Sequence, residues 1–180
     1  EINVGLVGSE MCIRDSLLDA AKQINGADLY VLGTGPLEND MRARVENENL
    51  TNVKMLGYKG GDELRDIVRK AKFTVITSEW HDNSPLVIYE SLSLGNPIIG
   101  SRMGGIPELI KEGVDGYVFD RGDMQTFVSR VNELIADPKK TIEMGKNARK
   151  KAEALYGFDE HYEKLMKLYD FTTTVARRKD

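Results

Sequence analysis

The sequence predicts one α/β domain over residues 1–180, a Rossmann-like doubly wound fold with about six parallel strands flanked by helices. Short runs of apolar and β-branched residues alternate with longer segments of helical composition, which is typical of a parallel sheet. Glycine and Asn-Gly turns separate the two kinds of segment. At 180 residues and 41% hydrophobic composition, the chain can fill one complete core.

The first half of the chain should contain three strand and helix pairs. We expect strands over residues 2–7, 27–32 and 52–56, each followed by a helix, over residues 17–22, 37–49 and 63–71. The last of these helices is amphipathic, because Leu64, Ile67 and Val68 fall on one face.

The second half should add three strands, over residues 73–77, 97–100 and 116–119. A helix entered at Gly105 should end near Gly113, and Asp123 should be the N-cap of the next helix. The tripeptide Arg121-Gly-Asp123 is therefore interpreted as a turn and a cap, not as a cell-adhesion motif. Two closing helices are expected over residues 139–156 and 159–171.

The polar stretch after residues 73–77 carries the most specific chemistry. Ser84 is the expected N-cap of a helix and Pro85 its first residue, so the N–H groups of Leu86 and Val87 should be available to an anion such as phosphate. Asp82 and Glu90 bracket this turn, and carboxylates accept hydrogen bonds from sugar and ribose hydroxyls. The stretch predicts a ligand with both phosphates and hydroxyls, at the carboxyl edge of the sheet.

This pattern resembles a known signature. An acid, seven residues and a glutamate, with Gly104-Gly-Ile-Pro-Glu108 further along, resemble the donor-binding motif of the retaining GT-B glycosyltransferases of group one, also called family four. The resemblance implies the C-terminal, donor-binding half of a GT-B fold. It also implies a UDP-, GDP- or other nucleoside-diphosphate sugar as substrate, with no separate cofactor.

The resemblance also implies roles for individual residues. Glu90 would bind the ribose and Asp82 would contact the donor sugar, where it could stabilise charge in the transition state. The family more often has Glu at the first position, so Asp82 shortens the reach to the sugar. Backbone between the acids would hold the diphosphate, from Asn83, Ser84, Pro85, Leu86 and Val87. Other loops would line the cleft, with Gly33 and Gly35 near the nucleotide, Tyr58 or Lys59 over the base, and Gly104 and Gly105 near the sugar.

Simpler interpretations compete with several of these roles. Asp82 alone could be a helix cap, and Glu90 alone a solvated surface charge. Gly33 and Gly35 could form only a tight turn, since the full dinucleotide pattern Gly-x-Gly-x-x-Gly is missing. Tyr58 could serve packing.

Residues 8–16 depart from the resembling family. Where that family has Arg and Lys for the diphosphate, this chain reads Gly-Ser-Glu-Met-Cys-Ile-Arg-Asp-Ser. Arg14 could take the place of one of these basic residues in space, but its position does not match the motif. The segment is either a divergent, degenerate loop or a sequencing or assembly artefact. We favour the artefact, because the sequence on both sides matches the family. Either explanation puts diphosphate binding by this exact chain in doubt.

Composition excludes several classes of site. The net charge of −4 gives no overall attraction to nucleic acid, and one cysteine, Cys12, permits neither an intrachain disulfide nor a cysteine zinc site. No Asp-x-Asp occurs, so we expect metal-independent binding. No apolar run is long enough to span a membrane. We expect a cytoplasmic location, with or without peripheral membrane attachment of the full-length protein.

The expected function is therefore donor binding for transfer of a sugar to an acceptor hydroxyl. The partner would be an N-terminal acceptor-binding domain of the same full-length protein, and without it the chain should show negligible turnover. A nucleotide-sugar epimerase-like domain is one alternative. A non-catalytic nucleotide-binding or interaction domain with a decayed donor site is another.

Overall fold

A computed structural model describes residues 3–7, 13–78 and 81–176 of the chain. The strands are β1 Asn3–Val7, β2 Asp28–Leu32, β3 Val53–Gly57, β4 Phe73–Ile76, β5 Ile98–Ser101 and β6 Gly116–Phe119. The helices are α1 Ile13–Ala21, α2 Glu38–Asn47, α3 Gly61–Lys70, α4 Leu86–Ser93, α5 Ile106–Leu109, α6 Met124–Ala136, α7 Pro138–Leu155 and α8 Phe158–Ala176.

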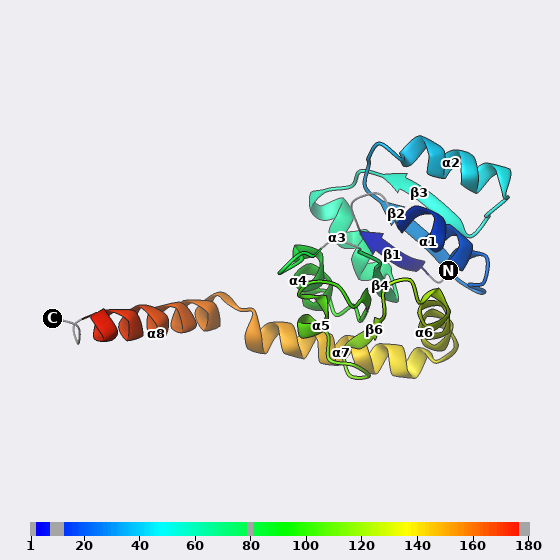
Figure 1. Cartoon of the computed structure of the whole chain (residues 1–180). Coiled ribbons are helices and arrows are strands. Elements are labelled where there is room, and N and C mark those ends of the chain that lie inside the picture. Colours follow the sequence, from blue (N-terminus) through cyan, green and yellow to red (C-terminus); the bar gives the residue numbers. More distant parts are fainter. Residues whose placement is uncertain (1–2, 8–12, 79–80, 177–180) are drawn as a thin grey trace.

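The six strands form one parallel sheet in the order β3-β2-β1-β4-β5-β6, which confirms the predicted doubly wound α/β fold (Figure 1). The strand order reverses between β1 and β4, so the chain winds outward from the middle of the sheet in both directions. In such sheets, ligands bind at this reversal, outside the carboxyl ends of the strands. The fold therefore predicts a ligand site at the loops after β1 and β4.

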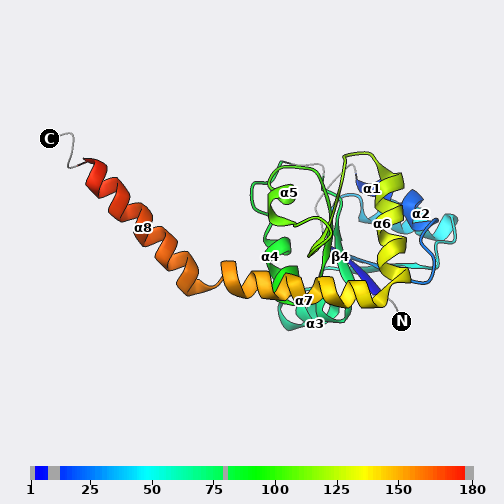
Figure 2. The ribbon, with the colours of Figure 1, turned by 90° about the horizontal axis from the view of Figure 1, so that it is seen from below.

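Helices cover both faces of the sheet and enclose two apolar clusters. One cluster combines α1 and α6 with the strands, and its largest fully buried side chains include Phe73 and Phe127. The other combines α4, α5 and the second half of α7, around Ile88 and Ile106. Figure 2 shows α1 and α6 on one side of β4 and α4 and α5 on the other. All four residues of β4 are buried, as expected for a central strand covered on both faces.

Some expected helix boundaries are wrong, beginning with the start of the first helix, which lies at Ile13 and not at residue 17. The helix after Gly105 ends at Leu109 and not near Gly113, because Ile110 is extended and the Asp115 carboxylate accepts a hydrogen bond from the Lys111 N–H, 2.7 Å away. The last helix continues to Ala176, beyond the expected end at residue 171. The expected N-cap at Asp123 is confirmed, since its carboxylate accepts the Thr126 N–H at 3.0 Å.

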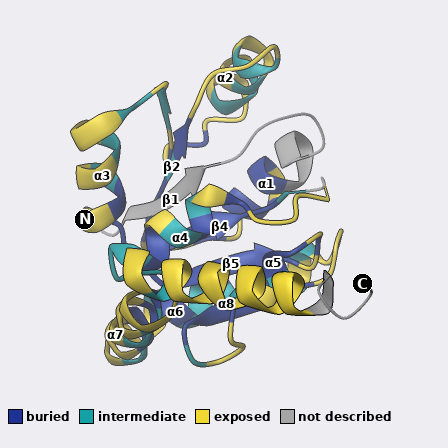
Figure 3. Cartoon of the chain, turned by 90° about the vertical axis from the view of Figure 1, so that its left-hand side faces the viewer, coloured by how far each residue is buried: buried dark blue, intermediate teal, exposed yellow. Residues whose placement is uncertain are grey.

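Helix α8 extends away from the rest of the molecule (Figures 1 and 2). Every side chain from His161 to Thr174 is exposed, as the colouring of Figure 3 shows. Large apolar side chains are among them, and Phe171 is 65% exposed. Apart from its connection to α7, this helix contributes little to the core of the domain.

Candidate functional site

The candidate site lies at the carboxyl edge of the sheet, where four loops carry the predicted residues. Gly33 and Gly35 follow β2, and Tyr58 and Lys59 follow β3. Asp82 lies in the loop after β4, and Gly104 and Gly105 lie in the loop after β5. Because all strands are parallel, these loops emerge at the same edge.

The loops after β4 and β5 are in direct backbone contact. The Gly105 N–H donates to the Asp82 carbonyl at 2.8 Å. A Cβ atom added at Gly104 would lie less than 3.0 Å from the Asp82 backbone, and one added at Gly105 would lie equally close to the Asn83 backbone. Gly104 also has a φ of 51°, which favours glycine. The two glycines therefore allow the β5 loop to support the loop that carries Asp82.

The Asp82 side chain organises its own turn. Its Oδ1 accepts a hydrogen bond from the Ser84 N–H at 2.9 Å, and the side chain is exposed. This contact closes a turn ahead of the helix and is not the helix cap considered for Asp82, since no side chain caps α4. It leaves Oδ2 available to a ligand. Ser84 is not the N-cap of α4; its hydroxyl instead lies 2.7 Å from the Tyr89 hydroxyl.

Helix α4 begins one residue later than the sequence predicted. Pro85 is its N-cap and Leu86 its first residue. The Ile88 N–H donates to the Pro85 carbonyl at 3.0 Å, whereas the N–H groups of Leu86 and Val87 precede the first helical hydrogen bond. The two amides predicted to bind phosphate therefore do lie at the helix start, next to the Asp82 turn.

Glu90 lies in the second turn of α4 and is exposed. Ile88 and Leu92 on either side of it in sequence are fully buried, so packing of α4 directs Glu90 away from the core. In the described part of the chain, no hydrogen bond or ion pair engages the Glu90 carboxylate. The structure thus leaves this acid available to a ligand, but does not join it to Asp82.

The loops after β2 and β3 form a second group. The Gly33 N–H donates to the Gly57 carbonyl at the end of β3 at 2.8 Å, and Gly33 has a φ of 120°, a backbone conformation that favours glycine. Gly35 has open space around it. Tyr58 is 74% exposed, so it is not part of the core, although its ring lies next to Gly60. Lys59 forms an ion pair with Glu63 at 2.5 Å and would have to exchange this partner for a nucleotide.

Two residues that sequence reasoning missed also contribute to this edge. The Ser101 hydroxyl donates to the Ser78 carbonyl at 2.5 Å and ties the end of β5 to the loop after β4. Thr77 is buried, and its hydroxyl has no hydrogen-bond partner among the described residues. The same sequence signal would have identified both residues, namely a polar residue at the end of an otherwise apolar strand.

The segment that departs from the family pattern lies mostly outside the described residues. This applies to residues 8–12 and to the side chain of Arg14. Glu79 and Trp80, in the loop after β4, also lie outside the described residues. Among the residues that are described, no group of three or more His, Cys, Asp or Glu side chains is placed to hold a metal ion. No helix in the same residues is long and apolar enough to cross a membrane.

Known proteins share both the sequence pattern and the fold. An uncharacterized glycosyltransferase of Methanocaldococcus jannaschii is 29% identical over 135 residues, which cover 75% of this chain and 38% of that protein. The sulfoquinovosyl transferase of Arabidopsis thaliana is 29% identical over 155 residues, which cover 84% of this chain and 29% of that protein. This chain thus spans well under half the length of either relative.

The structural comparison gives the same result. The crystal structure of HepE from Anabaena in complex with UDP matches 94% of this chain and 48% of its own, with a TM-score of 0.82 and 21% identity. This match confirms the C-terminal Rossmann-like domain of the GT-B fold. The model of the family "Glycosyl transferases group 1" matches residues 14–151, which include the loops after β2, β3, β4 and β5. The chain is a member of the group 1 glycosyl transferase family.

Proposed function

We propose that this chain is the donor-binding half of a retaining glycosyltransferase, which transfers a sugar from a nucleoside-diphosphate sugar to an acceptor hydroxyl. The observation that carries the proposal is the start of α4. There the glycines after β5 support the Asp82 turn, the N–H groups of Leu86 and Val87 begin the helix, and the carboxylates of Asp82 and Glu90 are both exposed. Amides suit a diphosphate, and carboxylates suit the hydroxyls of ribose and sugar.

Family membership and a structural neighbour support the choice of ligand. HepE of Anabaena has been crystallised with UDP and with UDP-glucose. In the proposed arrangement, the Leu86 and Val87 amides bind the diphosphate and Glu90 accepts hydrogen bonds from the ribose. Asp82, on the other side of the helix start, faces the donor sugar through its Oδ2 atom. In the same arrangement Tyr58 stacks on the base, and its high exposure after β3 supports this role.

We propose that donor binding needs no metal ion. Backbone amides at the helix start supply the positive potential that a divalent cation supplies in other diphosphate sites. No Asp-x-Asp pair exists in the sequence to hold such a cation.

A second domain is the proposed partner, and α8 is the element that supports this. Its exposed aromatic and aliphatic side chains, including Phe158 at 81% and Leu168 at 56%, find no cover in the described part of the chain. Large apolar side chains that gather on one exposed element mark contacts with other domains or proteins. We propose that α8 packs against the N-terminal acceptor-binding domain of the full-length protein.

The experiment is calorimetric titration of the chain with UDP and with GDP, each with and without EDTA. We expect binding that EDTA leaves unchanged, and weak affinity for this exact sequence, because residues 8–16 lack the Arg and Lys of the family. A charge-assisted hydrogen bond contributes about 1.5–3 kcal/mol, so restoring these two residues should strengthen binding by at least tenfold.

Two outcomes would contradict the proposal. Binding that disappears with EDTA would refute the metal-free mode. No binding of either nucleotide by the chain with the restored loop would refute the donor site, and would favour the alternative of a domain whose nucleotide site has decayed.

A further inference from the structure

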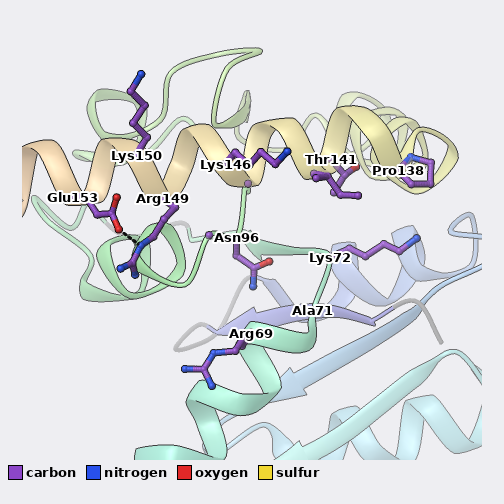
Figure 4. Close-up of a pocket in the computed structure, with 13 residues that line it drawn as sticks. Arg69, Ala71, Lys72, Asn96, Pro138, Thr141, Lys146, Arg149, Lys150 and Glu153 are labelled. Carbon is purple, nitrogen blue, oxygen red and sulfur yellow. Dashed lines mark hydrogen bonds and ion pairs between the residues drawn. The ribbon is translucent and has the colours of Figure 1, made fainter.

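A cavity of about 540 Å³ lies at the opposite edge of the sheet from the candidate donor site. Lys72 precedes β4 and Asn96 precedes β5, so the cavity is at the amino ends of these strands. One wall is the end of α3, and the other is one face of α7 (Figure 4). Nothing in the proposed sugar transfer uses this region.

Close backbone packing fixes the shape of the cavity. A Cβ atom added at Gly145 of α7 would lie less than 3.0 Å from the Gly95 carbonyl oxygen, so helix and turn are in direct contact. The buried Asn96 side chain donates to the Val68 carbonyl and ties the same turn to α3. The two walls are therefore held by contacts that do not depend on exposed side chains.

The cavity gathers positive charge in an acidic chain. Five basic side chains and one carboxylate line it, whereas the whole sequence carries a net charge of −4. The basic residues come from α3, from the turn before β4 and from α7, and they are Arg69, Lys72, Lys146, Arg149 and Lys150. Because positions 146, 149, 150 and 153 of α7 are three or four residues apart, they share one face of the helix.

Part of this charge has a structural explanation. Arg149 donates to the Ser93 carbonyl at the end of α4 and pairs with Glu153 at 2.7 Å. Arg69 pairs with Asp66 at 3.0 Å. Such cations complement the negative end of a helix or an exposed acid. They do not need a ligand.

Lys72 and Lys146 lack that explanation. Neither lysine has a carboxylate or hydrogen-bond partner within residues 13–78 and 81–176. Lys72 is half-buried, and Lys146 extends from the opposite wall. Figure 4 shows both side chains pointing the same way along the cavity, whereas Lys150 points away from it. Two unpaired ammonium groups on facing walls suit one ligand with more than one negative charge.

We propose that this cavity binds a phosphate-bearing anion between Lys72 and Lys146, separately from any nucleotide at the carboxyl edge. Lysine binds phosphate as a compact point charge, without the fixed two-bond geometry by which arginine recognises a planar carboxylate. Two lysines in an open cavity therefore suit a phosphate better than a carboxylate. Ala71, Pro138 and Ile142 add an apolar wall, so the phosphate could be inorganic or belong to a lipid headgroup.

The test is a titration of the ¹⁵N-labelled chain with pyrophosphate in the presence of UDP, monitored by NMR. The amides of Gly95, Asn96 and Gly145 report this cavity, and those of residues 82–84, 86 and 87 report the donor edge. We expect pyrophosphate, or vesicles of phosphatidylglycerol but not phosphatidylcholine, to shift the cavity amides. The first result identifies a soluble phosphate as the ligand and the second a lipid headgroup.

A double variant, Lys72→Gln with Lys146→Gln, should weaken this binding by about tenfold or more, since it removes two charge-assisted contacts. The matched control, Lys54→Gln with Lys111→Gln, makes the same change in net charge at exposed lysines outside the cavity. It should bind like the parent. Equal affinity in the two double variants, or no shift of the cavity amides with pyrophosphate or either vesicle, would overturn the proposal.

Discussion

The lack of a Cβ atom at two glycines determines how closely the loops after β4 and β5 approach each other. Gly104 and Gly105 contact the backbone of Asp82 and Asn83 at distances that leave no room for a Cβ atom. Sequence reasoning placed these glycines near the ligand. The structure adds that they also support the turn that carries Asp82.

Gly105→Ala should therefore displace the Asp82 turn. Because the neighbouring atoms are backbone, we expect a loss of about 1–3 kcal/mol in the free energy of unfolding, as for overpacking elsewhere, together with weaker nucleotide binding. Urea unfolding measures the first effect. Gly35→Ala is the matched control, since Gly35 lies at the same edge with open space around it and should change stability by less than about 0.5 kcal/mol. Equal stabilities of the two variants would contradict the support role.

The site residues show what local sequence can and cannot specify. The start of α4 was predicted to within one residue, because Pro85 and the preceding polar residues mark a boundary. The capping residue was predicted wrongly, since Ser84 had an equally good partner in the Tyr89 hydroxyl, which only the folded helix brings within 2.7 Å. The ion pair of Lys59 with Glu63 was also missed, although its four-residue spacing was visible.

At the scale of elements, a cluster around Glu133 joins β6, α6 and α7. The Glu133 carboxylate accepts hydrogen bonds from the Tyr117 hydroxyl at 2.7 Å and from Lys140 at 2.6 Å, and it pairs with Arg130 at 2.9 Å. These donors, Lys140 first, lower the pKa of Glu133 from 4.5 to about 2. A carboxyl with a lowered pKa in the folded state stabilises the protein above its unfolded pKa and loses this effect as the pH falls.

Glu133→Gln should then destabilise the chain by about 1–2 kcal/mol at pH 7, less than the full pKa shift would give because the side chain is partly exposed. The difference from the parent should persist down to about pH 5 and shrink between pH 4.5 and 2, where the parent carboxylate becomes protonated. Thermal unfolding across this range measures it. Glu143→Gln, at an exposed position of α7, is the control. A difference that does not change with pH would show that the Glu133 charge is not what stabilises the cluster.

Helix boundaries were predicted correctly where a side chain caps the helix, and wrongly where tertiary contacts end it. Asp123 was identified correctly as a cap because its carboxylate bonds within its own turn. The end of α5 at Leu109 depends on the buried Asp115, which binds the Lys111 N–H and pairs with Lys151 of α7 at 2.9 Å. Sequence alone does not show that α7 passes there.

At the scale of the whole molecule, alternation of apolar strands and helices was enough to predict a parallel sheet of about six strands, but not the order of the strands in it. The position of α8 was not predictable in this way. Its composition resembles that of a packed helix, but its side chains from His161 to Thr174 are all exposed. The cavity between α3 and α7 was equally invisible, because it depends on contact between Gly95 and Gly145, which are distant in sequence.

Removal of α8 should leave the rest of the domain almost unchanged. A chain that ends at Gly157 should unfold in urea within about 1 kcal/mol of the full chain, because the deleted helix buries little apolar surface. Heteronuclear NMR spectra of the shorter chain should retain the signals of residues 13–150. A loss of more than about 2 kcal/mol in the free energy of unfolding would mean that α8 packs on this domain in solution. That result would contradict the proposed packing of α8 against a second domain.

The central claim is that the helix start between Asp82 and Glu90 binds the donor nucleotide, and comparison of two carboxylate variants tests it most directly. Calorimetry should show that Glu90→Gln weakens UDP binding by about 1–2 kcal/mol, because one charge-assisted hydrogen bond to the ribose becomes a neutral one. Asp82→Asn should bind UDP nearly as the parent does, because UDP has no sugar for its free oxygen to contact and the amide oxygen can still accept the Ser84 N–H. If Glu90→Gln is folded and binds UDP as tightly as the parent, the assignment of the ribose to this acid is wrong.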